Sequence, residues 1–201
     1  MELNRKIILP IAYWGSIVYQ GILIQNNCII DIYENFKKQS IHSRCEILGP
    51  NKIIKLNVPK VRKSSSKTSI KNLSINYDHN WQKVHWKSLI SCYRSSPYFE
   101  YYEEELEKLY QNKIQGLLEW NILIQKKFFE LIDVKKKLEF TNKFQKNYIE
   151  KDYRDQNFRT NNVPKYTQVF GKEFHKNLSI LDLLFNLGPD TKKYLENLSL
   201  N

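Results

Sequence analysis

Residues 7–30 form an uncharged and mostly apolar segment that follows the basic pair Arg5 and Lys6. The first 18 of these residues match the length and flank of a minimal membrane span. Polar and helix-breaking residues interrupt the segment, and it lacks the cleavage site of a signal peptide. These interruptions are Pro10, Gly15, Ser16, Gln20 and Gly21. The segment therefore predicts no transmembrane helix but a Rossmann-like βαβ unit, with strands over 6–13 and 28–33 and a helix over 17–25.

The remaining chain changes from strand-like to helix-like patterning near Asp78. Gly49 and Pro50 separate two short apolar segments and predict a hairpin, whereas apolar residues recur at helical spacing beyond Asp78. Expected strands cover 45–48, 52–59, 73–77 and 166–170, and expected helices cover 80–94, a segment starting at 97, 112–138 and 178–186. We therefore predict one α/β domain over 1–201, with a small mixed sheet, a strand-rich part (1–78) and a helix-rich part (79–201).

The net charge of +11 comes almost entirely from lysine, because the chain has 26 lysines and 6 arginines. Lysine, isoleucine and asparagine, whose codons are A/T-rich, make up 68 of the 201 residues. The lysine excess is therefore typical of an A/T-rich genome, whereas phosphate-binding surfaces favour arginine. We expect a solvated lysine surface and no nucleic-acid partner.

Three cysteines without a C-x-x-C pair, together with four histidines, provide neither a disulfide framework nor a structural zinc site. This composition is typical of a reducing compartment. We expect a cytoplasmic protein that binds no metal and no cofactor, and the sequence predicts no oligomeric state.

Five segments carry a family resemblance. They read PIAYWGSIVY at 10–19, ENFKKQSIHSRCEI at 34–47, LNVP at 56–59, INYDHNWQKVHWKSLISCYRSSPYFEYY at 75–102 and QVFGKEFHKNLSILDLLFNLGP at 168–189. In this order they resemble the WbqC-like protein family, in the form found in Bacteroidetes, over nearly the whole chain. The chain departs from the usual family pattern at residues 10–13 and 174–176.

The resemblance implies a cytoplasmic role in the biosynthesis of surface polysaccharide or another envelope glycan. It implies a protein that binds or modifies sugars, as a possible acyl or aminoacyl transferase, with a nucleotide-activated or lipid-linked sugar as its partner. An alternative from another class is a non-catalytic nucleic-acid-binding or assembly protein. Such a protein would use the basic stripe Lys83, Lys87 and Arg94 and the polar loop 61–69.

Arg44 is the first candidate for ligand binding, because a rare arginine in a lysine-rich chain suggests a bidentate contact to phosphate or carboxylate. A structural ion pair is the competing interpretation. Ser40 lies in the same loop, and Tyr13 and Trp14 are expected to line the pocket. Asn177 is a candidate only through the resemblance.

His85 is the candidate general base, because its spacing from Trp81 and Leu89 places it on the apparently buried face of the helix over 80–94. A hydrogen-bonded core histidine is the alternative. Asp78 and His79 precede this helix, where the carboxylate either orients an imidazole for catalysis or complements the helix N-terminus.

Overall fold

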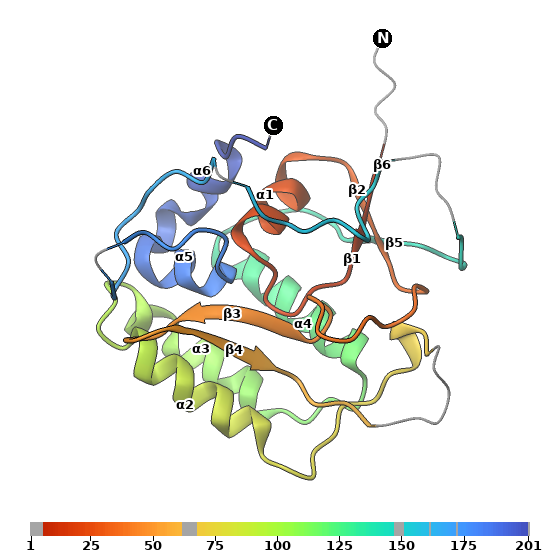
Figure 1. The fold of residues 1–201 in the computed structure, drawn as a ribbon, viewed down its shortest axis with the longest axis horizontal. Coiled ribbons are helices and arrows are strands. Elements are labelled where there is room, and N and C mark those ends of the chain that lie inside the picture. The colour runs from red at the N-terminus through yellow and green to blue at the C-terminus, as the bar shows by residue number, and fades with distance from the viewer. Residues whose placement is uncertain (1–5, 62–67, 147–150, 161, 172, 201) are drawn as a thin grey trace.

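The structure is a computed structural model that describes residues 6–61, 68–146, 151–160, 162–171 and 173–200. It contains a parallel four-stranded sheet in the order β5-β2-β1-β6 and a separate antiparallel hairpin of β3 and β4 (Figure 1). The strands are β1 (Ile7–Pro10), β2 (Cys28–Asp31), β3 (Arg44–Leu48), β4 (Ile53–Asn57), β5 (Glu139–Phe140) and β6 (Lys151–Asp152). The helices are α1 (Ile17–Gln25), α2 (Trp81–Tyr93), α3 (Phe99–Gln111), α4 (Leu117–Leu131), α5 (Ile180–Leu187) and α6 (Thr191–Glu196), with 3-10 turns η1 (Ile70–Asn72) and η2 (Gly188–Asp190).

The βαβ opening is confirmed. β1 and β2 pair in parallel from Ile7 with Cys28 to Pro10 with Asp31, and α1 connects them. α1 begins after Ser16, whose side chain accepts a hydrogen bond from the Tyr19 amide and caps the helix. Since all four residues of β1 are buried, the apolar segment forms the interior of a parallel sheet, whose strands are covered on both faces.

Strands from the C-terminal half complete this sheet. β5 pairs with β2, and β6 pairs with β1, both in parallel. The sheet therefore takes strands from both sides of residue 78. The α/β fold class is confirmed, with its parallel and antiparallel pairs placed in two separate sheets.

Two expected strands are not formed. Residues 73–77 bury Leu73 and Ile75 but make only isolated bridges, because the neighbouring segments each match them at a single position. Residues 166–170 form no ladder, since Tyr166 and Gln168 hydrogen-bond instead through their side chains to the buried carboxylate of Asp182. In both short segments, apolar and polar residues alternate as in a strand, but the side chains pack without a continuous ladder of backbone hydrogen bonds.

The helices enclose the hairpin. In Figure 1, β3 and β4 cross the middle of the molecule, with α2 and α3 on one side and α1 and α5 on the other. α2 packs on α3, and α5 contacts α1, α3, α6 and β3. The helix expected over 112–138 is shorter in the structure, where it is α4. Gly116 is extended before α4, and Asp133 adopts a positive φ of 50° after it. In the described ranges, no helix is long and apolar enough to cross a membrane.

Candidate functional site

A pocket of about 330 Å³ opens at the carboxyl ends of the parallel strands. Its walls include Pro10 at the end of β1, residues 37 and 39–42 from the connection after β2, and residues 154–159 shortly after β6. The chain leaves β1 for β2 on one side, and β6 pairs on the other side of β1. This edge is the topological switch point of the sheet, where ligands of open α/β sheets bind.

Arg44 reaches the pocket from the first position of β3. Its Nε atom is buried and has no hydrogen-bond partner. In the described part of the chain, its guanidinium makes neither a hydrogen bond nor an ion pair. The buried Nε carries a desolvation cost, and the two terminal nitrogens of the guanidinium, which are not buried and make no hydrogen bond in the described residues, are available to a ligand.

The other cations of the pocket already have partners. Lys37 Nζ lies 2.5 Å from Asp155 Oδ1, and Arg159 Nη2 lies 3.1 Å from Glu46 Oε2. Both pairs join the segment after β6 to the rest of the pocket wall. Since these pairs neutralise their own charges, Arg44 is the cation of the pocket that is left for an anionic ligand.

Arg154 is the most firmly held of the arginines that line the pocket. Its guanidinium contacts the Asp31 carboxylate at 3.0 Å and the Asp152 carboxylate at 2.5 Å, and it donates to the Gln145 and Lys146 carbonyl oxygens. The bonds to Asp152 raise the pKa of Arg154 and lower the pKa of Asp152. This group therefore anchors β6 and the following segment to β2.

The turn between β1 and α1 carries two aromatic residues, Tyr13 and Trp14, whose side chains both hydrogen-bond to the Tyr110 hydroxyl. Trp14 lines the pocket and has a φ of 42°, a strained conformation for a bulky residue. Its indole Nε1 donates to the Tyr110 hydroxyl at 2.9 Å. Tyr13 lies behind the wall, where its hydroxyl is 2.8 Å from His85 Nδ1 and 3.1 Å from the Tyr110 hydroxyl. Trp14 thus belongs to the pocket wall and Tyr13 does not, although both side chains are almost fully buried.

His85 lies in the core and not in the pocket wall. Its side chain is 5% exposed and packs edge-on against Trp81. Desolvation lowers its pKa to about 4, against a smaller opposing effect of a hydrogen bond to the Asn57 backbone. This position corresponds to the alternative of a hydrogen-bonded core histidine, because His85 does not line the pocket.

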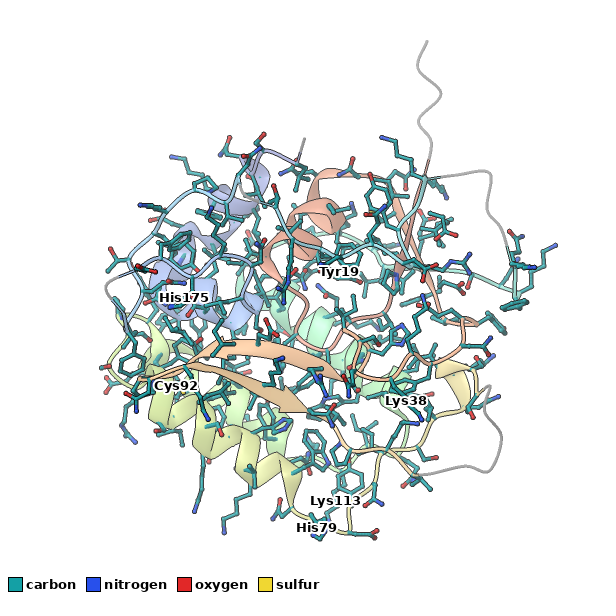
Figure 2. The ribbon with its side chains drawn as sticks, viewed as in Figure 1. Tyr19, Lys38, His79, Cys92, Lys113 and His175 are labelled. Atoms are coloured by element: carbon teal, nitrogen blue, oxygen red, sulfur yellow. The ribbon has the colours of Figure 1, made fainter. Side chains whose placement is uncertain are left out.

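Asp78 and His79 are exposed at the start of α2, and Figure 2 shows His79 at an outer edge of the molecule. Asp78 accepts hydrogen bonds from the side-chain amide of Asn76 and does not contact a histidine ring in the described chain. Neither residue lines the pocket. Asn80 is the N-cap of α2, since its side chain accepts from the Lys83 amide.

Ser40 and Asn177 line the pocket together with Arg44 and Trp14. The Ser40 hydroxyl donates to the Lys37 carbonyl oxygen at 2.7 Å and shapes the loop. Asn177, in a left-handed conformation with a φ of 60°, donates to the Thr160 carbonyl oxygen and accepts from the Thr160 amide. Both side chains thus fix the backbone of the pocket walls.

Cys45 and His42 also line the pocket, but their surroundings do not activate a thiolate. Burial raises the pKa of the Cys45 thiol far above its ordinary value. His42 Nδ1 accepts from the Lys37 amide, so Nε2 carries the proton and faces Glu34 Oε1 at 3.0 Å. Both ring nitrogens of His42 are therefore occupied.

Sequence reasoning missed Arg154 and Arg159. The chain has six arginines, and three of them line this pocket. The argument that singled out Arg44, the scarcity of arginine among lysines, applies equally to these two residues. They were missed because residues 139–165 have no periodicity that would assign them to an element.

The basic stripe of the alternative function lies on α2. Lys83, Lys87 and Arg94 are exposed, with the apolar Val84 exposed between the first two. Of the accompanying loop, residues 62–67 lie outside the described residues. Nucleic-acid binding thus stays the alternative hypothesis.

No group of three or more histidine, cysteine, aspartate or glutamate side chains in the described segments could hold a metal ion.

Comparison with protein-family models gives a match to the WbqC-like protein family, over residues 25–153 and 137–194. No match was found among the curated proteins or the solved structures.

Proposed function

The chain belongs to the WbqC-like protein family, and we propose that its pocket binds the anionic group of a nucleotide-activated or lipid-linked sugar used to build surface polysaccharide or another envelope glycan. The observation that carries the proposal is the Arg44 guanidinium, which faces the pocket with no partner in the described structure. Arginine binds phosphate and carboxylate through two parallel hydrogen bonds.

The wall around Arg44 supports a sugar as the ligand. The pocket is lined by apolar residues such as Pro10 and Phe158 and by polar residues such as Ser16 and Asn157. Small-molecule sites typically join an apolar surface to a few polar groups that fix orientation. At about 330 Å³, the pocket is at the lower end of the size range of such sites. We therefore assign the sugar and its anionic group to this pocket, and further parts of the ligand to its open side.

We propose sugar binding as the function of this pocket. Acyl or aminoacyl transfer is a more specific hypothesis for the same pocket. The raised pKa of Cys45 keeps its thiol protonated at neutral pH. His85 is sealed in the core, and both ring nitrogens of His42 are occupied. The three cysteines are free, which supports a cytoplasmic location.

The test is a thermal-shift and calorimetric screen of the purified chain against nucleotide sugars, sugar 1-phosphates, uronic acids and neutral sugars. A ligand of the folded state raises stability by RT ln(1 + [L]/Kd). We expect a saturable shift with at least one anionic sugar. Since charge-assisted hydrogen bonds contribute about 1.5–3 kcal/mol, Arg44→Gln is expected to weaken that binding by about 10-fold to 100-fold.

Arg94→Gln is the matched control, because Arg94 is an exposed arginine on α2, away from the pocket. It is expected to leave sugar binding unchanged. Short RNA and DNA at two salt concentrations complete the screen. Equal binding by wild type and Arg44→Gln would overturn the proposal, and so would salt-sensitive shifts with nucleic acid and none with sugars.

A further inference from the structure

Glu46 links two cations at the edge of the pocket. Arg159 Nη2 lies 3.1 Å from Glu46 Oε2, and Lys55 Nζ lies 3.7 Å from the other oxygen, Oε1. Lys55 is directly opposite Glu46 in the β3–β4 hairpin. Glu46 would therefore keep a neutralising partner if Arg159 moved away.

Arg159 can leave this contact at low cost. Its side chain is 60% exposed and makes a single bond to the carboxylate, and exposed ion pairs of this kind stabilise proteins only weakly. The Arg154 side chain, by contrast, is 10% exposed and contacts two carboxylates. Arg159 is thus the movable arginine of the pocket, and Arg154 the fixed one.

The hairpin places Arg159 close to Arg44. Arg44 and Glu46 are two residues apart in β3, so their side chains leave the same face of the strand, about 7 Å apart along it. Both residues, and Arg159 with them, line the pocket. An anionic group beside Arg44 would lie within the reach of an arginine side chain held at Glu46.

We infer that Arg159 exchanges Glu46 for the ligand and, together with Arg44, holds a phosphate group, so that the pocket selects phosphorylated sugars over sugars that carry a carboxylate. This inference rests on the proposed function and specifies its substrate class. Arg44 alone satisfies a carboxylate through two parallel bonds. A phosphate has a further oxygen and a larger charge, which a second guanidinium can bind.

The experiment compares dissociation constants for glucose 1-phosphate, UDP-glucose and glucuronate by calorimetry. Arg159→Gln is expected to weaken binding of the two phosphate compounds about tenfold and to leave glucuronate binding unchanged. Glu46→Gln releases Arg159 and is expected to tighten phosphate binding about threefold to fivefold. Lys55→Gln leaves Glu46 with Arg159 as its partner and is expected to weaken phosphate binding slightly.

Glu100→Gln is the charge-matched control for Glu46→Gln, because Glu100 is exposed on α3 and does not line the pocket. If Glu46→Gln binds phosphate compounds no more tightly than Glu100→Gln, the exchange of partners is wrong. Phosphate binding that Arg159→Gln leaves unchanged, or glucuronate binding as strong as phosphate binding, would overturn this inference. The proposed function would stay intact in both cases as long as binding depends on Arg44. Absence of binding by every sugar in the wild type would overturn both.

Discussion

Arg154 and Arg44 line the same pocket, yet their surroundings differ. Arg154 contacts Asp31, Asp152 and two carbonyl oxygens, whereas Arg44 has a buried Nε without a partner. Asp31 is fully buried, so Arg154 compensates a charge that the fold has removed from water. The hydrogen bonds of Arg154 hold β2, β6 and the following segment together, whereas the guanidinium of Arg44 is available to a ligand.

Two residues of the same type thus have different roles, because Arg154 has partners within the protein and Arg44 has none in the described residues. The same reasoning extends to the aromatic cluster behind the wall, where the Tyr13 hydroxyl joins His85 and Tyr110. Paired polar groups of this kind fix one arrangement of a core. The pairing of each polar group should therefore determine how strongly its substitution lowers the free energy of unfolding.

Arg154→Met is expected to lower the free energy of unfolding by about 3–5 kcal/mol, because it leaves the Asp31 carboxylate buried without its cation. Urea denaturation followed by circular dichroism measures this change. Arg94→Met is the control, since Arg94 is exposed, and its effect should stay within about 0.5 kcal/mol. If the two variants were equally stable, the Asp31–Arg154 pair would not hold the sheet together.

The second prediction concerns pH and His85. Its folded-state pKa of about 4 lies below the ordinary value of 6.5, so the unfolded chain takes up a proton first as pH falls. Stability should therefore decline from about pH 6.5 to pH 4, by up to about 3 kcal/mol from this residue, and this contribution should not change further below pH 4.

His85→Gln keeps an acceptor for the Tyr13 hydroxyl but does not titrate, so it should remove this part of the pH dependence. His79→Gln, at an exposed position, should leave the pH profile unchanged. Urea denaturation at several pH values between 4 and 7 measures the slopes. A wild-type slope that survives in His85→Gln would assign the pH dependence to other groups.

The sequence predicted the local parts of the fold well. The apolar segment with its interruption at Gly15 and Ser16 and the Gly49–Pro50 turn are short-range signals, and they correspond to β1, α1, β2 and the hairpin. β5 and β6 could not be predicted, because strands of two mostly polar residues have no periodicity. Their pairing depends on the tertiary structure that brings residues 139–140 beside β2 and residues 151–152 beside β1.

The candidate site was predictable only in part. Trp14, Ser40, Arg44 and Asn177 do line one pocket. Helical spacing correctly indicated that His85 is buried, and this same burial keeps it from a ligand. Arg159 could be assigned to the pocket only from the structure, because its contact with Glu46 joins residues that are 113 positions apart in the chain.

The smallest expected effect on stability belongs to Arg44→Met. The substitution keeps an unbranched apolar side chain but removes the buried Nε donor that has no partner, so no hydrogen bond is lost and one desolvation cost disappears. We expect the free energy of unfolding to stay the same or to rise by up to about 1 kcal/mol, in urea denaturation beside Arg94→Met. A decrease of more than about 1 kcal/mol would instead support the structural ion pair that the sequence left open for Arg44. An unchanged or raised stability combined with loss of sugar binding would show that the fold keeps this arginine at a cost, for the ligand alone.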